Sequence, residues 1–388
     1  MSELKALVIG GGIGGLSAAI ALRQAGVAAH VFERGRELER TQYGSGFFLW
    51  SNAIAALGRL GLAERVAAAG APIEWFRETT ARGELLAVWP VGEMAQAIGV
   101  PSVCIARADL HPILAGALVP GALTLGAVGT GYAQDADGVT ARFADGQEER
   151  GDLLIGADGI RSAVRGQLLG PHQTHYAGYT AWRGIVPFVH PLAPEDTFSE
   201  TWGRGARFIH YPVGGGCHYL SGFLAVPEDF TEPAAGRRAM LLERFCDWPE
   251  PIAALIETAR EEDLHRTAVA THRPFRRWGE GRVTLLGDAA HPMTPNLGQG
   301  ACQAIEDAVV LASYLERTHA GGEVAAALRT YEDRRRGRTT SLMMRAWGIG
   351  LTGRMKHPLA VELRDRISKV MFNTVALKQQ RQDMVFDG

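Results

Sequence analysis

The chain has 388 residues, of which 46% are hydrophobic and 21% are charged, so it can bury a sizeable core and form about two domains. Its formal net charge is −2, which gives no general electrostatic reason to expect nucleic-acid binding. The four cysteines lack paired spacing, which is typical of reduced thiols in a cytoplasmic protein. No signal peptide is expected, and Pro120 and several glycines break the uncharged residues 113–134, so no membrane span is expected there.

The first 34 residues predict the start of a parallel sheet. In the stretch KALVIGGGIGGLSAAIALRQAGVAAHVFER (residues 5–34), an apolar strand at residues 6–9 runs into glycines. A helix follows over residues 16–24, and a second apolar strand covers residues 27–32. This order of strand, glycine-rich turn, helix and strand is typical of domains that bind a dinucleotide.

The glycines of this stretch have separate roles in such a domain. Gly10 permits the tight turn, Gly12 lets the backbone approach a pyrophosphate, and Gly15 allows the helix to pack closely on the strand. Glu33 closes the second strand, where its carboxylate can accept a hydrogen bond from a ribose hydroxyl. An acid at this position disfavours the 2′-phosphate of NADP, but the motif does not choose between NAD and FAD.

Further along the chain, two segments offer polar side chains next to predicted turns. Arg107 precedes a helix and can reach phosphate or ribityl oxygens with two N–H groups of its guanidinium; a surface ion pair is the alternative. Residues 131–156 alternate and turn like a β-meander. DLLIGADGIRSAVR (residues 152–165) then predicts a strand, a turn at Asp158 and Gly159, and the start of a helix.

Residues 173–271 predict a second sheet, because they contain longer strands rich in tyrosine, tryptophan and phenylalanine. This sheet is expected to form one wall of a substrate pocket. Arg207 can bind an anionic group there or lie at a strand edge, and Tyr219 can line the pocket or pack in the core. His210 and Tyr211 are neighbours on one strand and point to opposite faces, so at most one of them faces the pocket.

The stretch VTLLGDAAHPMTPNLGQGACQAIEDAVVLASYL (residues 283–315) predicts a strand, a Gly–Asp turn, a loop and a helix. Asp288 would lie at the carboxyl end of the strand, where it can bind a polyol hydroxyl. Gly298 and Gly300 open the helix, whose positive end would stabilise an anionic flavin ring. NAD has no ribityl group, so this pairing favours FAD.

The C-terminal residues 322–388 are expected to be mostly helical. The basic run at residues 334–338 is interpreted as a solvated helix face, which is commoner than a binding patch. The twelve histidines show no spacing typical of metal ligands, so no metal site is expected.

Together, the four motifs in this order resemble the single-component FAD-dependent aromatic hydroxylases with the p-hydroxybenzoate hydroxylase fold, among them salicylate, 6-hydroxynicotinate and urate hydroxylases. The resemblance covers about residues 5–340 and implies an α/β protein. Its parts are a Rossmann-like FAD-binding domain of the glutathione-reductase type, a substrate domain with a second, mixed β-sheet, and C-terminal helices. We expect the FAD-binding domain at residues 1–73, 100–172 and 272–350. We expect the substrate domain at residues 74–99 and 173–271, and the C-terminal helices at residues 351–388.

The resemblance also implies cofactors, partners and site residues. FAD would be bound, and NAD(P)H would bind transiently to reduce it. The reduced flavin would react with O2 to form a C4a-hydroperoxide. This hydroperoxide would hydroxylate an aromatic or N-heterocyclic small molecule. A monomer or homodimer in the cytoplasm is expected, with no nucleic acid or membrane as partner. The implied FAD-binding residues are Gly10, Gly12, Gly15, Glu33, Arg34, Arg107, Asp158, Asp288, Pro295, Gly298 and Gly300. The candidates in the substrate pocket are Arg207, Tyr219, His210 and Tyr211.

The sequence departs from its relatives at substrate-binding positions. Asn296 stands where urate hydroxylase carries an acid, and Phe48 stands where 6-hydroxynicotinate monooxygenase carries a histidine. With Phe47 and Trp50, Phe48 indicates an apolar pocket suited to a larger aromatic compound. Three alternatives stay open: a flavoprotein of the same fold that acts as an epoxidase or isoprenoid reductase, a non-catalytic flavin-binding protein, and an NAD dehydrogenase built on the first motif alone.

Overall fold

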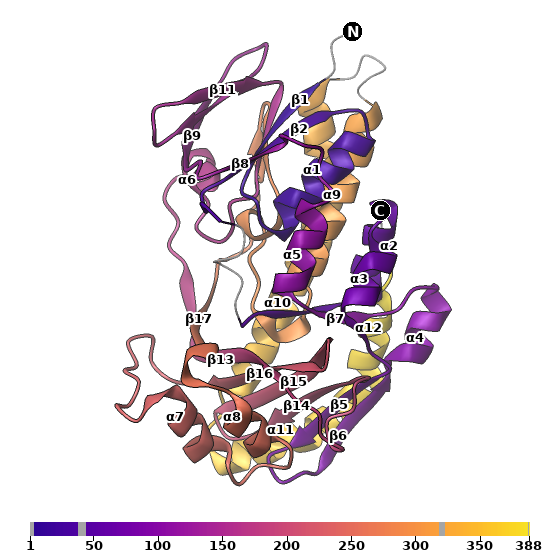
Figure 1. The fold of residues 1–388 in the computed structure, drawn as a ribbon, viewed down its shortest axis with the longest axis vertical. Helices are drawn as coiled ribbons and strands as arrows, with labels where there is room; N and C mark the ends of the chain where they lie inside the picture. The colour runs from indigo at the N-terminus through magenta and orange to yellow at the C-terminus, as the bar shows by residue number, and fades with distance from the viewer. Residues whose placement is uncertain (1–3, 38–43, 318–322, 387) are drawn as a thin grey trace.

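The computed structural model describes residues 4–37, 44–317, 323–386 and 388. Its two largest sheets lie toward opposite ends of the long axis of the molecule, and helices run between them (Figure 1). No helix in this part of the chain is both long enough and apolar enough to cross a membrane.

The first large sheet has six strands and carries the predicted dinucleotide-binding unit. Its order is β18-β19-β12-β1-β2-β8, and every neighbouring pair is parallel except β18 and β19. The strands are β1 (Lys5–Ile9), β2 (Ala28–Glu33), β8 (Leu123–Leu125), β12 (Leu153–Gly156), β18 (Gly279–Glu280) and β19 (Val283–Leu285). The strands expected at residues 6–9, 27–32, 152–156 and 283–286 therefore all belong to one sheet, as the resemblance implied.

Helices α1 (Ile13–Gln24) and α9 (Gly300–Glu316) pack against each other beside this sheet (Figure 1). The parallel order brings the carboxyl ends of β1, β2, β12 and β19 to one edge of the sheet. Ligands bind at this edge in open α/β sheets. The motifs that follow β1, β12 and β19 therefore lie together, although they are far apart in the sequence.

The second large sheet has seven strands in the order β17-β13-β16-β15-β14-β5-β6. All pairs are antiparallel except β14 and β5, which are parallel. The strands are β5 (Trp75–Thr80), β6 (Leu85–Pro90), β13 (His175–Pro187), β14 (Thr197–Trp202), β15 (Ala206–Gly214), β16 (Cys217–Leu224) and β17 (His265–Thr271). On one face, Trp182 and Phe208 pack in a buried cluster with residues of α7 (Gly236–Phe245) and α8 (Ile252–Thr258).

Smaller elements complete the fold. The predicted meander forms a three-stranded sheet of β9 (Gly129–Gln134), β10 (Val139–Phe143) and β11 (Glu148–Gly151). Another sheet joins β3 (Gly46–Leu49), β4 (Ala71–Pro72) and β7 (Val103–Ala106). The remaining helices before residue 170 are α2 (Ser51–Arg59), α3 (Ala63–Ala69), α4 (Val91–Ile98), α5 (Arg107–Ala115) and α6 (Ala163–Leu169). The 3-10 turns are η1 (Glu261–Asp263), η2 (Gly287–Ala289) and η3 (Pro295–Leu297).

The C-terminal part is helical, as expected: α10 (Val324–Gly353), α11 (Pro358–Met371), a π-helical turn η5 (Phe372–Ala376) and α12 (Leu377–Asp383). Helix α10 has 30 residues and is therefore about 45 Å long. It contacts β18 and β19 in the six-stranded sheet, and its last turn reaches Arg207 in the seven-stranded sheet through Gly353. This one helix thus contacts both large sheets.

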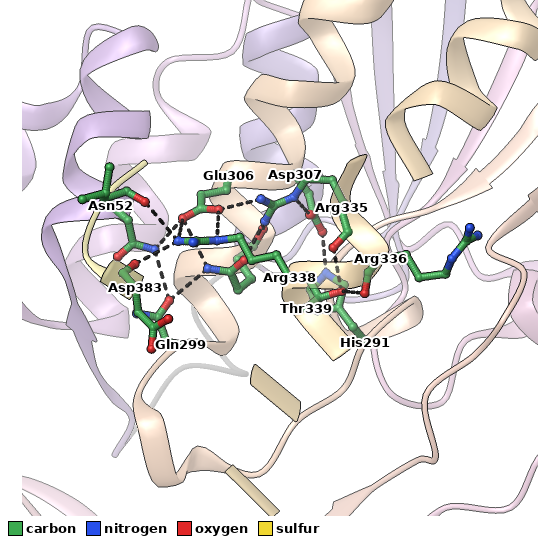
Figure 2. A network of polar contacts seen from close by, with 12 residues as sticks. Asn52, His291, Gln299, Glu306, Asp307, Arg335, Arg336, Arg338, Thr339 and Asp383 are labelled. Carbon is green, nitrogen blue, oxygen red and sulfur yellow. Dashed lines mark hydrogen bonds and ion pairs between the residues drawn. The ribbon is translucent and has the colours of Figure 1, made fainter. Parts of the chain in front are cut away.

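A buried network of charges fixes α10 to α9 (Figure 2). Arg335 is 1% exposed and donates to Asp307 at 2.7 Å and to Glu306 at 2.6 Å. The other oxygen of Asp307 accepts from the backbone N–H of Gly287 at 3.0 Å and contacts Nε2 of His291 at 2.5 Å. Burial alone would raise the pKa of Asp307, but His291 and Arg335 outweigh it and lower that pKa to about 2. The expectation of a solvated face at residues 334–338 is therefore wrong for Arg335, because the carboxylates that bind it come from another helix.

We predict that Arg335→Ala lowers the free energy of unfolding by about 3–5 kcal/mol, because it leaves two buried carboxylates without their cation. The matched control is Arg336→Ala on the next position, where the partly exposed side chain pairs with exposed Asp333 and should contribute less than about 1 kcal/mol. Urea unfolding followed by circular dichroism measures both. Equal losses in the two variants would contradict the role given to the network.

Candidate active site

A cavity of 1390 Å³ lies between the two large sheets and brings their functional residues together. Ligand pockets for one small molecule are usually about 300–1,000 Å³, so this cavity has room for a dinucleotide and a second compound. Its lining includes Gly12, Asp158 and Asp288 from the first sheet, and Phe76 and Tyr211 from the second. The predicted cofactor residues and the predicted pocket wall therefore face one space.

The turn after β1 has the geometry that the glycine motif predicted. Gly10 has φ +110°, and a Cβ atom there would lie 2.4 Å from the carbonyl oxygen of Ala157. A Cβ atom on Gly15 would lie 1.9 Å from the carbonyl oxygen of Gly10, so only glycine allows this close packing. A Cβ atom on Gly12, in contrast, would meet nothing within 4 Å and would point into free space beside the cavity. That space is where a pyrophosphate would lie.

Glu33 is held in place at the end of β2 by two backbone amides. Its carboxylate accepts from the N–H of Gly11 and from the N–H of Gly35, both at 2.7 Å. A carboxylate has about four lone-pair positions, so it keeps capacity for a ribose hydroxyl. The next residue, Arg34, is exposed and lines the cavity.

Arg107 and Asp288 are an oppositely charged pair of residues that line the cavity. Arg107 is the first residue of α5, and its Nε atom is buried with no hydrogen-bond partner among the described residues. Burial and Arg183 lower the pKa of Arg107, while Asp288 and Glu33 act in the opposite direction. Asp288 lies in the η2 turn with its side chain open to the cavity, and the surrounding protein raises its pKa through desolvation. Both groups are available to a polar ligand.

Asp158 lines the cavity and also caps a helix. Its Oδ2 atom accepts from the N–H groups of Ala163 and Val164 at the start of α6, at 2.7 and 3.3 Å. Its Oδ1 atom is buried and has no hydrogen-bond partner in the part of the chain that the structure describes. Sequence reasoning missed Arg165, which donates to the carbonyl oxygen of Ala289 at 2.9 Å. Arg165 thereby ties this segment to the turn that holds Asp288.

The loop before α9 supplies the last predicted cofactor residues. Pro295, Gly298 and Gly300 all line the cavity, Gly298 has φ +63°, and Gly300 is the first residue of α9. Trp50 donates from its indole N–H to the carbonyl oxygen of Leu297 at 3.0 Å, which holds the loop against β3 and α2. The free N–H groups of the 17-residue helix therefore begin at the cavity wall.

These features fit FAD. The open space at Gly12 suits a pyrophosphate, and the Nε atom of Arg107 and the Oδ1 atom of Asp158 are polar atoms that a bound ligand can satisfy. Asp288 can accept from ribityl hydroxyls, and the start of α9 can stabilise negative charge on a flavin ring.

Five aromatic rings form a continuous stack on the cavity side of the seven-stranded sheet. Neighbouring ring centroids are 4.9, 4.7, 4.9 and 4.6 Å apart along the series Trp89, Phe76, Phe198, Tyr211 and Tyr219. Phe48 joins this stack, with its ring 5.1 Å from that of Phe198, and packs against Trp50 at 4.0 Å. All seven residues line the cavity, so this side of the cavity is predominantly aromatic.

The other pocket candidates lie elsewhere. His210 is buried on the opposite face of β15 from Tyr211 and does not line the cavity, so of this pair only Tyr211 does. Burial and His218 lower the pKa of His210 to about 3. Arg207 is also absent from the cavity lining: it donates to Glu200 at 2.9 Å and to Asn296, and its guanidinium lies 4.8 Å from the ring of Trp202. Direct contact of Arg207 with substrate stays a prediction.

Sequence reasoning missed two acidic residues in the cavity wall, Glu78 in β5 and Glu200 in β14. A signal was present: Phe76 precedes Glu78 by two positions, and Phe198 precedes Glu200 by two positions. Residues two apart on a strand share a face, so each acid is predicted to lie on the same face as an aromatic ring. Arg183 in β13 also lines the cavity and was not predicted.

We predict that Gly12→Ala stays folded but binds FAD at least about tenfold more weakly, because the added methyl group occupies the space of the pyrophosphate. Gly15→Ala should lower the melting temperature of the protein itself, since its Cβ atom would overlap the backbone. Thermal unfolding of the apoprotein and titration with FAD separate the two effects. Unchanged FAD affinity in Gly12→Ala would contradict the placement of the pyrophosphate beside Gly12.

We also predict that Asp288→Ala weakens FAD binding by about 1.5–3 kcal/mol, the usual contribution of a hydrogen bond to a charged group. Asp137→Ala in an exposed turn is the matched control and should leave FAD binding unchanged. The measurement is the flavin-to-protein absorbance ratio after gel filtration at several FAD concentrations. Full retention of FAD by Asp288→Ala would show that Asp288 does not contribute to FAD binding.

Known proteins share this arrangement. The model of the FAD binding domain family matches residues 3–213 and 238–346. Aurachin C monooxygenase/isomerase of Stigmatella aurantiaca is 41% identical over 99% of this chain and 98% of its own length. FAD-dependent urate hydroxylase of Klebsiella pneumoniae subsp. pneumoniae is 36% identical over 88% of both chains.

The same fold occurs in a crystal structure of Klebsiella pneumoniae HpxO complexed with FAD and uric acid. That structure has a TM-score of 0.91 and 33% sequence identity, over 98% of this chain and 96% of the other. FAD, the cofactor expected from the motifs, is thus bound in a solved structure that matches nearly the whole of this chain. The chain therefore belongs to the FAD binding domain family and, within it, to the FAD-dependent hydroxylases and monooxygenases.

Proposed function

We propose that this protein uses NAD(P)H and O2 to hydroxylate an aromatic or N-heterocyclic compound larger than a single ring. The observation that carries the proposal is that one cavity is lined both by the glycine-rich turn after β1 and by the aromatic stack. The named relatives act on urate or aurachin C, which supports a ring compound as substrate. When bound, FAD supplies the transfer of electrons from the reductant to oxygen.

The residues of the chain would orient the substrate and exclude water. Within the aromatic stack the rings cover one another's faces, so the wall presents mainly ring edges, against which a planar ring can pack edge to face. Tyr211 and Tyr219 add two hydroxyl groups to this wall. Burial raises the pKa of both tyrosines, so at neutral pH they are protonated and can donate hydrogen bonds to an oxygen on the substrate. Such bonds are stronger in an apolar site than in water.

Apolar residues of the C-terminal helices also bear on the size of the substrate. Helix α11 and the residues after it line the cavity with aliphatic side chains, among them Leu363, Ile367, Met371 and Val375. These side chains extend the apolar surface beyond the aromatic stack, which favours a compound with an apolar part next to its ring. The replacements at Phe48 and Asn296, described above, support a substrate other than urate or 6-hydroxynicotinate.

We propose the site residues and domains as the sequence predicted them, with Tyr211 rather than His210 in the pocket. Residues 1–73, 100–172 and 272–350 would bind FAD, residues 74–99 and 173–271 would bind substrate, and residues 351–388 would form the C-terminal helical segment. All four cysteines are free thiols, which supports the proposal of a cytoplasmic location. A monomer and a homodimer are both compatible with this proposal.

We expect the purified protein to be yellow with flavin absorption bands, and to oxidise NADH or NADPH under air. Adding a substrate-like phenol or hydroxylated N-heterocycle should accelerate this oxidation and yield a product that is 16 Da heavier, measured by mass spectrometry. The Gly12→Ala variant without FAD is the control and should oxidise neither reductant. A protein that remains colourless after incubation with FAD, or reductant oxidation that no ring compound accelerates, would overturn the proposal.

A further inference from the structure

Two buried carboxyl groups lie side by side on the aromatic face of the seven-stranded sheet. Glu78 in β5 is in register with Glu200 in β14, so their Cα atoms are about 4.8 Å apart on parallel strands. The two residues are 4% and 5% exposed, and both line the cavity. Two ionised carboxylates in such a place would repel each other strongly unless cations neutralise both.

Arg207 is the cation beside this pair, and it binds Glu200 and not Glu78. Arg207 donates from Nη1 to Glu200 at 2.9 Å and from Nη2 to Asn296. Its guanidinium also packs between aromatic rings, 4.8 Å from Trp202 and 5.0 Å from Phe223. The nearby Arg364 of α11 pairs with its neighbour Asp365 and packs over Trp202. No second cation is therefore free to neutralise Glu78 among the described residues.

Glu78 itself has an unused hydrogen-bonding capacity. Its Oε2 atom is buried and has no hydrogen-bond partner within the described residues. Burial and the charge of Glu200 raise the pKa of Glu78 well above its usual range, and Arg207 opposes this only in part. Because Arg207 binds Glu200 and not Glu78, Glu78 is the member of the pair placed to hold a proton, and in that form it has one hydrogen-bond donor beside one acceptor.

The position of Glu78 places this donor and acceptor next to the aromatic stack. Phe76 and Phe198, whose rings stack at 4.7 Å, precede Glu78 and Glu200 by two residues and share their face of the sheet. A ring that lies along this stack can direct its edge to Glu78. The cationic Arg183 is four strands away, about 19 Å, so the two ends of the wall differ in charge.

We propose that Glu78 is a substrate-binding residue that recognises an uncharged ring edge with adjacent hydrogen-bond acceptor and donor, such as the C=O and N–H of a ring lactam. A carboxylic acid pairs with this edge through two hydrogen bonds. Anionic rings are disfavoured there, because Arg207, which lies beside the two acids, is already bound to Glu200 and Asn296. The inference rests on the proposed function, which it deepens by naming the substrate class.

Three quinoline probes test the recognition on the FAD-loaded protein. They are 2-hydroxyquinoline, whose lactam form has both groups, quinoline, which has only an acceptor, and quinoline-2-carboxylate, which is an anion. Dissociation constants are measured from the change in flavin absorbance. We expect 2-hydroxyquinoline to bind at least about tenfold more tightly than either of the others. Equal or reversed affinities would overturn the proposal.

Variants at Glu78 separate recognition from a purely structural role. Glu78→Gln keeps a donor and an acceptor without charge, so it should bind 2-hydroxyquinoline within about threefold of the wild type. Glu78→Leu should lose at least about tenfold, with quinoline binding unchanged. The matched controls are Glu84→Gln and Glu84→Leu on the same hairpin, where the side chain is exposed. Unchanged affinity in Glu78→Leu would make Glu78 a structural acid and overturn the proposal.

A ligand-free measurement tests the protonation state. The infrared difference spectrum between wild type and Glu78→Gln at pH 7 should contain the C=O band of a protonated carboxyl group. A carboxylate band in its place would overturn the proposal. If the proposal fails while ring compounds still accelerate NAD(P)H oxidation, the proposed function stands; a colourless protein overturns that function instead.

Discussion

The buried charge network around Arg335 constrains the whole structure. Two carboxylates and a guanidinium are stable out of water only when their hydrogen bonds are made together, which requires one relative position of α9 and α10. Asp307 also binds the N–H of Gly287 and the ring of His291, so the turn that carries Asp288 is fixed by the same contacts. Asn52 of α2 donates to Glu306 at 2.6 Å, which joins α2 to the network.

Because α10 contacts both large sheets, fixing this helix also sets the position of one sheet relative to the other. The cavity is the space that results. Its cofactor end combines glycines, helix N-termini and the charged pair Arg107 and Asp288. Its other end is an aromatic stack with two tyrosines and two acids, and apolar residues of α11 also line the cavity. Hydrogen bonds formed in such an apolar space are stronger than in water, which favours a precise orientation of the substrate.

The sequence predicted the elements that depend on local rules. The glycine spacing at residues 10–15 requires a close approach of backbone to backbone, and the structure has it. The alternation of side chains along a strand predicted that only one of His210 and Tyr211 faces the pocket, and the structure selects Tyr211. The same rule, applied to Phe76 with Glu78 and Phe198 with Glu200, would have placed both acids in the wall.

Contacts between distant segments could not be predicted in this way. Arg335 lies in a basic run typical of a solvated face, yet it is buried because α9 brings Glu306 and Asp307 to it. Arg207 lies on the same face of its strand as Tyr211, but α10 covers it and it pairs with Glu200. Neither partner is near these arginines in the sequence, and a side chain's charge state and exposure depend on what surrounds it.

The sequence by itself determined the dinucleotide-binding unit, the FAD cofactor and the family, because glycine conformations, strand–helix alternation and short motifs are local properties of the chain. Only the tertiary structure decided which charged groups are buried and paired, which tyrosines reach the cavity, and that Glu78 lies buried beside Glu200 in the cavity wall. These properties depend on desolvation and on neighbours that the fold brings together from separate segments.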